Sequence, residues 1–155
     1  MRFQQIRELV RWAADYHARF ARLYSEKASS GEGGERLRMS LEYLAKHEQQ
    51  MQSELEQYLA EDSDHCGVLN TWFDDAVDIP HAPVLDRLSE SLNSDTVQTV
   101  LATALVAHRT LQDLYAQRVE HAVTGAEREL FESLSGRHEG EVRRLVRDMQ
   151  RLEDY

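Results

Sequence analysis

Apolar residues recur at alternating steps of three and four residues along most of this 155-residue chain. That spacing places them on one face of an α-helix, so it predicts helices that each bury one stripe against partners. Each predicted helix has roughly 25 residues and is therefore roughly 40 Å long. The four predicted helices span residues 2–29, 35–60, 95–123 and 126–153. With only 7 Gly and 2 Pro, the chain lacks the turn residues that a many-stranded β fold requires.

The connections predict how these helices are arranged. The turns at 30–34 and 124–125 are short, so each joins two antiparallel neighbours. Residues 61–94 are too long for a tight turn and suit a crossover along the length of a bundle. Within the crossover, residues 82–92 are expected to form a short helix. Its other apolar residues are expected to lie on the bundle: Val68, Leu69, Trp72, Phe73, Val77 and Ile79. We therefore predict a single domain, residues 1–155.

Polar residues interrupt the apolar stripes at matched places in the two halves of the chain. At several positions, adding 91 to a residue number in the first half reaches the same residue type in the second. The matched polar or aromatic pairs are His17 with His108, Tyr24 with Tyr115, His47 with His138, and Glu48 with Glu139. Helical periodicity aligns apolar residues by itself, but it does not explain matched polar residues. The constant offset indicates duplication of a helical hairpin.

With these residues the sequence resembles the ferritin-like superfamily, in its rubrerythrin-type branch, over all four helices. In that family, the first and third helices each supply a Glu and the other two each supply Glu-x-x-His. The six side chains hold a pair of iron or manganese ions. The resemblance implies an all-α, ferritin-like four-helix bundle with a long crossover between its second and third helices. It also matches Glu48 and Glu139 to the Glu of the two Glu-x-x-His motifs. Tyr24 and Tyr115 match a Tyr that is common two turns after the first Glu.

The ligand set departs from the family pattern at four positions. His17 and His108 stand where the family has its single Glu residues, and Met51 and Val142 replace the two motif histidines. The two matched carboxylates supply a charge of −2, which balances one divalent ion but not two. A normal di-iron centre is therefore not expected, nor are the ferroxidase, peroxidase and oxygenase activities of the family.

Two interpretations of His17, Glu48, His108 and Glu139 follow. In the first, no cofactor is bound, and His–Glu pairs neutralise one another through charge-assisted hydrogen bonds. The loss of both motif histidines favours this interpretation, which predicts a non-catalytic, partner-binding or structural protein. In the second, the four residues hold one Fe, Mn or Zn ion, because imidazole and carboxylate suit these metals. The protein is then a metal-binding protein or a small oxidoreductase.

Four further residues are expected in the central network or in support of the ligands: Tyr24, Tyr115, His47 and His138. The choice between Glu139 and His138 stays open, since His138 fits the apolar stripe of the last helix better. The Tyr hydroxyls are expected to bond a buried carboxylate.

Charge and composition limit the partners of the chain. It has 18 Lys and Arg against 28 Asp and Glu, a formal net charge of −10, so nucleic acid and anionic membranes are not expected partners. The single cysteine excludes an internal disulfide and a multi-cysteine metal site, and it fits a cytoplasmic location. No apolar run is long enough to span a membrane. A homodimer, the default for such bundles, and an unidentified protein partner are expected.

Overall fold

The computed structural model describes the chain except residues 1, 32, 61–65, 79–86, 88–95 and 154–155. The described residues are mostly helical, so the all-α prediction is confirmed at that coarse level. The four long helices are α1 (Ile6–Ser29), α2 (Gly34–Leu59), α5 (Val97–Glu120) and α6 (Gly125–Glu153). Among the described residues, no helix combines the length and the apolar character needed to cross a membrane.

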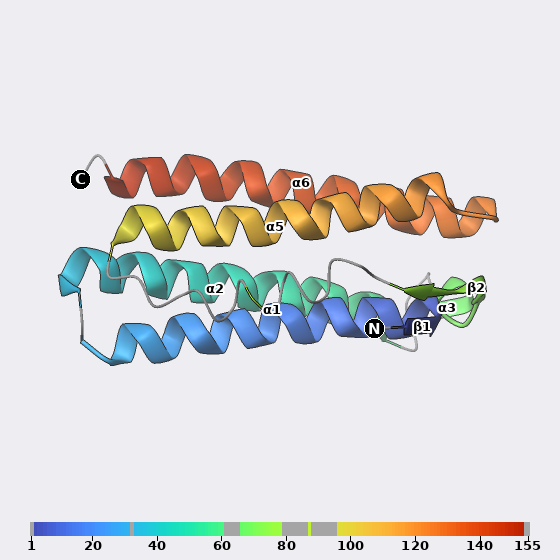
Figure 1. The fold of residues 1–155 in the computed structure, drawn as a ribbon, viewed down its shortest axis with the longest axis horizontal. Coiled ribbons are helices and arrows are strands. Elements are labelled where there is room, and N and C mark those ends of the chain that lie inside the picture. The colour runs from blue at the N-terminus through green and yellow to red at the C-terminus, as the bar shows by residue number, and fades with distance from the viewer. Residues whose placement is uncertain (1, 32, 61–65, 79–86, 88–95, 154–155) are drawn as a thin grey trace.

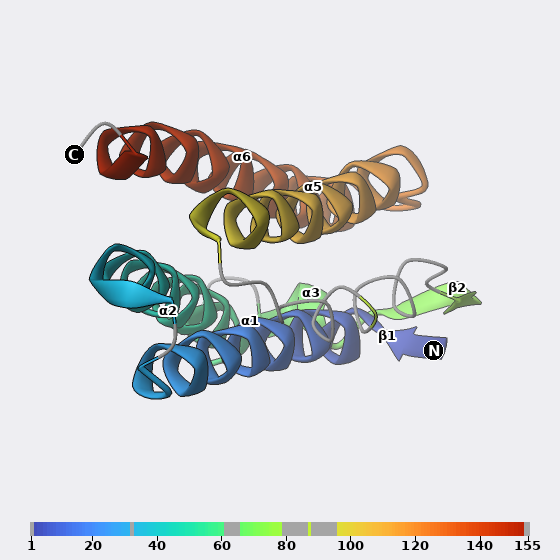
Figure 2. The same ribbon diagram turned by 60° about the vertical axis from the view of Figure 1, so that its left-hand side comes forward.

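The long helices form two antiparallel hairpins, α1 with α2 and α5 with α6 (Figure 1). Viewed from another side, the two hairpins lie as two layers (Figure 2). Helix α5 begins at the end of the molecule where α2 also begins, so these two helices run in the same direction. Helix α2 therefore ends, and α5 begins, at opposite ends of the molecule.

Polar groups at the helix starts explain where three of the long helices begin. The Glu8 carboxylate accepts from the backbone N–H of Gln4 at 2.8 Å, before the first turn of α1. The Thr96 hydroxyl accepts from Thr99 N at 3.3 Å before α5, and the Thr124 hydroxyl accepts from Glu127 N at 3.1 Å before α6. Such caps satisfy N–H groups that lack a partner inside the helix.

The turn between α1 and α2 depends on glycine. Gly31, Gly33 and Gly34 have φ angles of 74°, 84° and 85°, in the left-handed region that other residues adopt at a cost. Three such residues reverse the chain within a few positions, so α1 and α2 pack as neighbours.

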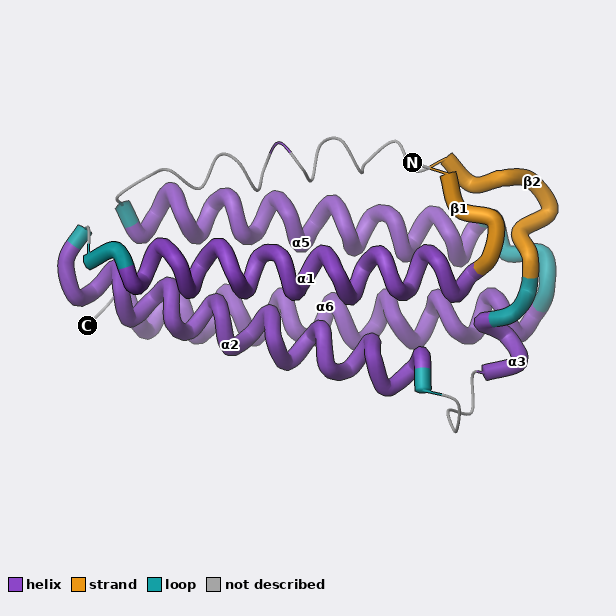
Figure 3. The backbone as a smooth tube through the Cα atoms, turned by 90° about the horizontal axis from the view of Figure 1, so that it is seen from below, coloured by secondary structure: helices purple, strands orange, loops and turns teal. Residues whose placement is uncertain are grey.

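A two-stranded ribbon at one end of the molecule corrects two sequence predictions. Strand β1 (Arg2–Gln5) pairs antiparallel with β2 (Trp72–Asp78), which follows the short helix α3 (Cys66–Leu69) (Figure 3). The first helix was predicted from residue 2, but these residues are extended because they bond to the crossover. Leu69 is fully buried, whereas Trp72 is 63% exposed, so the expectation that Trp72 lies on the bundle is wrong.

Val68 and Phe73 are partly buried against the core, as expected. Of the other crossover predictions, Val77 lies in β2. Ile79 and most of the helix predicted over 82–92 fall outside the described residues.

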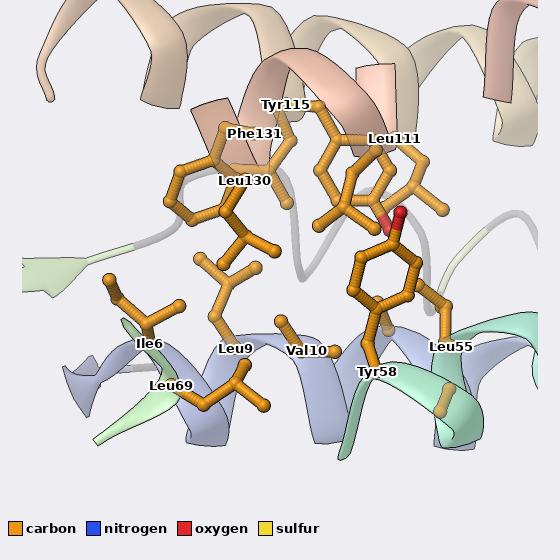
Figure 4. Packing of buried hydrophobic residues seen from close by; sticks show 14 of the residues in the cluster. Ile6, Leu9, Val10, Leu55, Tyr58, Leu69, Leu111, Tyr115, Leu130 and Phe131 are labelled. Atoms are coloured by element: carbon orange, nitrogen blue, oxygen red, sulfur yellow. The ribbon is translucent and has the colours of Figure 1, made fainter. Parts of the chain in front are cut away.

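The apolar core consists of two clusters, one toward each end of the bundle. On α1 the first cluster takes residues 6–14 and the second takes residues 16–28. The other three long helices are divided between the clusters in the same way. In the first cluster, side chains from α1 point toward those of α5 and α6, so it joins the two hairpins (Figure 4). Apolar packing thus closes both ends and leaves a mid-length level for polar groups.

Candidate metal centre

A layer of buried polar side chains lies where the two apolar clusters meet. All four long helices contribute to it, and no member is more than 8% exposed. The members are His17 from α1, His47 and Glu48 from α2, His108 from α5, and His138 and Glu141 from α6. Buried imidazoles and carboxylates are costly without partners, so the pairing within this layer decides what it can do.

Glu48 lies at the centre of the layer, between two imidazoles. Its Oε2 is 2.6 Å from His17 Nδ1, and its Oε1 is 2.6 Å from His108 Nε2. Burial raises the pKa of the Glu48 carboxyl. The two imidazoles lower it through charge and hydrogen bonds, and together their effect is larger than that of burial. The net pKa lies well below the usual range, so Glu48 is an anion at neutral pH. The sequence prediction that His17, Glu48 and His108 lie together is confirmed.

His138 supports His108 rather than a carboxylate. Its Nε2 donates to the backbone carbonyl of His108 at 2.8 Å, and the two rings lie 5.3 Å apart. Burial lowers the pKa of His138 to about 3, and the neighbouring imidazoles His108 and His17 lower it as well. His138 is therefore neutral over the physiological range, with its proton on Nε2.

His47 has one nitrogen bonded and one nitrogen left over. Its Nε2 lies 3.1 Å from Glu141 Oε2. Since an ionised carboxylate only accepts, Nε2 carries the proton and Nδ1 carries a lone pair. Nδ1 is buried, and no hydrogen-bond partner for it exists among the described residues. Burial lowers the pKa of His47, and His108 lowers it as well. Nδ1 therefore stays unprotonated and keeps its lone pair.

His47, Glu48 and His108 form a group that could hold a metal ion. One ligand atom from each of the three lies within 4.8 Å of the others, and all three side chains are buried. Two imidazoles and one carboxylate suit zinc, iron and manganese. The donor chemistry therefore fits a divalent transition metal.

Glu139 is not part of this layer, so its prediction as a ligand is wrong. It lies on the exposed side of α6, and its Oε1 accepts from Arg143 at 2.6 Å. His138 faces the interior in its place. One residue is a rotation of about 100° on a helix, so two neighbours seldom face the same way. The open choice between Glu139 and His138 is settled in favour of His138.

Sequence reasoning missed Glu141, whereas it did place His47 in the central network or in support of the ligands. The buried line on α6 contains Phe131, Leu134, His138, Glu141, Leu145 and Met149. Steps of three and four connect these residues, so the periodicity of α6 already pointed to Glu141. The 91-residue offset pointed to Glu139 instead, because α6 and α2 turn different faces toward the core.

Tyr24 and Tyr115 are almost fully buried, and among the residues described their hydroxyls have no hydrogen-bond partner. Burial raises the pKa of both, and the Glu48 carboxylate raises that of Tyr24 further. Tyr115 lies edge-on to His138 at 5.8 Å. Both residues thus adjoin the layer as predicted, but the expected bond to a buried carboxylate is not formed.

Comparison of the chain with protein-family models, with curated proteins and with solved structures found no match. Support for a function comes from the polar layer itself.

Proposed function

We propose that this protein binds one divalent transition-metal ion in the middle of the bundle, with His47, Glu48 and His108 as ligands. The observation that carries this proposal is that ligand atoms of His47, Glu48 and His108, one from each, lie within 4.8 Å of one another. In the same layer the buried His47 Nδ1 has no hydrogen-bond partner among the described residues. A buried acceptor left unpaired costs about 1–3 kcal/mol. A bound ion removes that cost.

Glu141 prepares His47 for this role. Histidines that bind metals usually donate their other N–H to a carboxylate or a carbonyl, which fixes the ring and the free nitrogen. His47 donates Nε2–H to Glu141, which leaves the buried Nδ1 without a hydrogen bond to any described residue. Glu141 lies on α6 and His47 on α2, so this pair also connects the two hairpins.

Binding of the ion displaces a proton. For His108 to bind through Nε2, the proton between Nε2 and Glu48 Oε1 moves to His108 Nδ1 or, where Nδ1 already holds one, to solvent. The carboxylates of Glu48 and Glu141 supply −2, and the Arg144 guanidinium, 3.5 Å from Glu141 Oε1, offsets part of that charge. Three protein ligands leave a coordination position for water, as in sites where zinc acts as a Lewis acid.

A ferritin-like origin belongs to the same proposal. The two antiparallel hairpins, the long crossover and the matched histidine pairs support it. On this view the chain is a bundle that keeps one ion of an ancestral pair.

The direct test is metal analysis of the purified full-length chain after dialysis against Zn²⁺, Mn²⁺ or anaerobic Fe²⁺. About one ion per chain is expected. His47→Gln and His108→Gln are each expected to lose the ion while circular dichroism shows intact helices. His121→Gln is the matched control, because His121 is exposed at the end of α5. No bound ion under any condition, or full retention in both variants, overturns the proposal.

A second candidate is a metal-free, non-catalytic bundle that acts by binding a protein partner or as a structural unit. One observation favours it: both oxygens of Glu48 already accept hydrogen bonds, so the carboxylate is satisfied without an ion. Thermal melting separates the two candidates. A ligand at about 100 times its Kd adds about 2.7 kcal/mol of stability, so zinc raises the melting temperature only in the first case.

A further inference from the structure

A small pocket adjoins the polar layer. Its volume is about 20 Å³, which is room for one water molecule. Four of its lining residues carry imidazole or carboxylate groups, namely His17, Glu54, His138 and Glu141. The side chain of Arg137 also lines the pocket, and its guanidinium lies 5.3 Å from the ring centre of Tyr58.

The pocket touches all three proposed ligands through their partners. His17 lines it and bonds Glu48, and Glu141 lines it and pairs with His47. His138 lines it and donates to the carbonyl of His108. The pocket thus lies one side chain away from the position of the ion. The ligands themselves are at most 5% exposed, so an ion reaches them only by a route through neighbouring side chains.

We propose that this pocket is the port through which a divalent cation is loaded into the centre. The inference rests on the proposed function. A space for one water cannot admit an ion with its full hydration shell, so the wall has to replace the lost water ligands. The four imidazole and carboxylate groups can do this for the same metals that suit the centre. An apolar wall could not. Glu54, a partly buried residue of the lining, attracts the cation, and the Arg137 guanidinium repels it.

Loading kinetics of Zn²⁺ on the full-length chain test the port. Association is followed against a chromophoric chelator, and dissociation is followed after addition of excess EDTA. Glu54→Gln is expected to slow both rates by about three- to tenfold at low ionic strength, with the Kd changed less than about twofold. Glu56→Gln is the matched control on the same helix: it removes the same charge from an exposed side chain outside the pocket lining. It is expected to leave both rates unchanged.

A second variant blocks the pocket physically. Leu134 lines it, and Leu134→Phe is expected to slow association and dissociation together by about tenfold or more. Circular dichroism checks that this variant folds, and Glu54→Gln decides the matter if it does not.

Wild-type rates in the variants, with Kd intact, overturn the port and leave the metal centre standing. Failure of the unaltered protein to bind zinc at equilibrium overturns the proposed function itself.

Discussion

The carboxylate of Glu48 accepts hydrogen bonds from one imidazole of each hairpin, so its removal should lower the free energy of unfolding of the whole bundle. Glu48→Gln keeps the size of the side chain but removes its charge. It also replaces one acceptor oxygen by an NH₂ donor. Either His17 Nδ1–H or His108 Nε2–H then faces a donor and loses its acceptor. The other bond becomes one between neutral groups.

The magnitude follows from these two losses. A hydrogen bond to a charged group is worth about 1.5–3 kcal/mol, and a buried donor left unpaired costs about 1–3 kcal/mol. Removing a buried charge returns part of its desolvation cost, which offsets some of the loss. We therefore expect Glu48→Gln to lower the free energy of unfolding by about 2–4 kcal/mol at pH 7 without metal.

Urea denaturation at pH 7 in EDTA, followed by circular dichroism at 222 nm, measures this change. The slope of the unfolding free energy against urea should stay constant, since the exposed surface is the same. Glu139→Gln is the control, because it removes an exposed carboxylate paired with Arg143 and should cost at most about 1 kcal/mol. If Glu48→Gln matches the unaltered chain within about 0.5 kcal/mol, the carboxylate is not the buried anion described above.

Four further predictions concern the centre and the fold. Glu141→Gln should weaken zinc binding by about 10–100-fold in calorimetry, whereas Glu139→Gln should not; equal affinities would show that His47 needs no orienting carboxylate. In EDTA, the free energy of unfolding should fall as pH drops below about 6.5. Below that pH His138 binds a proton in the unfolded chain. In the folded chain it stays neutral, because its pKa is lowered to about 3. His138→Gln should flatten this urea-measured slope, and an unchanged slope would contradict the assignment. Leu44→Ala, at a fully buried site, should cost about 2–5 kcal/mol in urea, and a loss below about 1 kcal/mol would contradict tight packing there. Thr96→Ala should cost about 1 kcal/mol through loss of the α5 cap, and no loss would mean that the cap is replaced by water.

The long helices were predictable because each buries one continuous stripe, and a stripe of that length has no strand counterpart. His17, Glu48 and His108 were predictable for the same reason. Each occupies a step of a stripe, so each had to face the interior. Glu139 was predicted from the 91-residue offset and the family resemblance, although His138 fits the stripe of α6 better. Where duplication and periodicity disagree, periodicity decides which side chain is buried, because it reports the packing of this chain.

The rest depends on contacts between distant segments. Strand β1 has four residues, too few for an alternating pattern, and its partner β2 begins at Trp72. His47 carries its lone pair on Nδ1 because its Nε2–H donates a hydrogen bond to Glu141, which is 94 residues away in the sequence. No local pattern reports such a pairing. The ribbon and the tautomer of His47 therefore became visible only in the structure.

The layer is symmetric in its imidazoles and asymmetric in its carboxylates. Each hairpin contributes two histidines related by the same offset, but only the first turns its matched carboxylate, Glu48, inward. That one anion serves His17 and His108, one from each hairpin. The second inward carboxylate, Glu141, comes from a different position and is engaged by His47. Each carboxylate is thus paired with imidazole, and Glu141 lies in addition 3.5 Å from the Arg144 guanidinium, which offsets its charge. A second ion would need at least two more inward carboxylates. Because Glu139 faces outward, the proposed centre has carboxylate charge for one ion per chain at most.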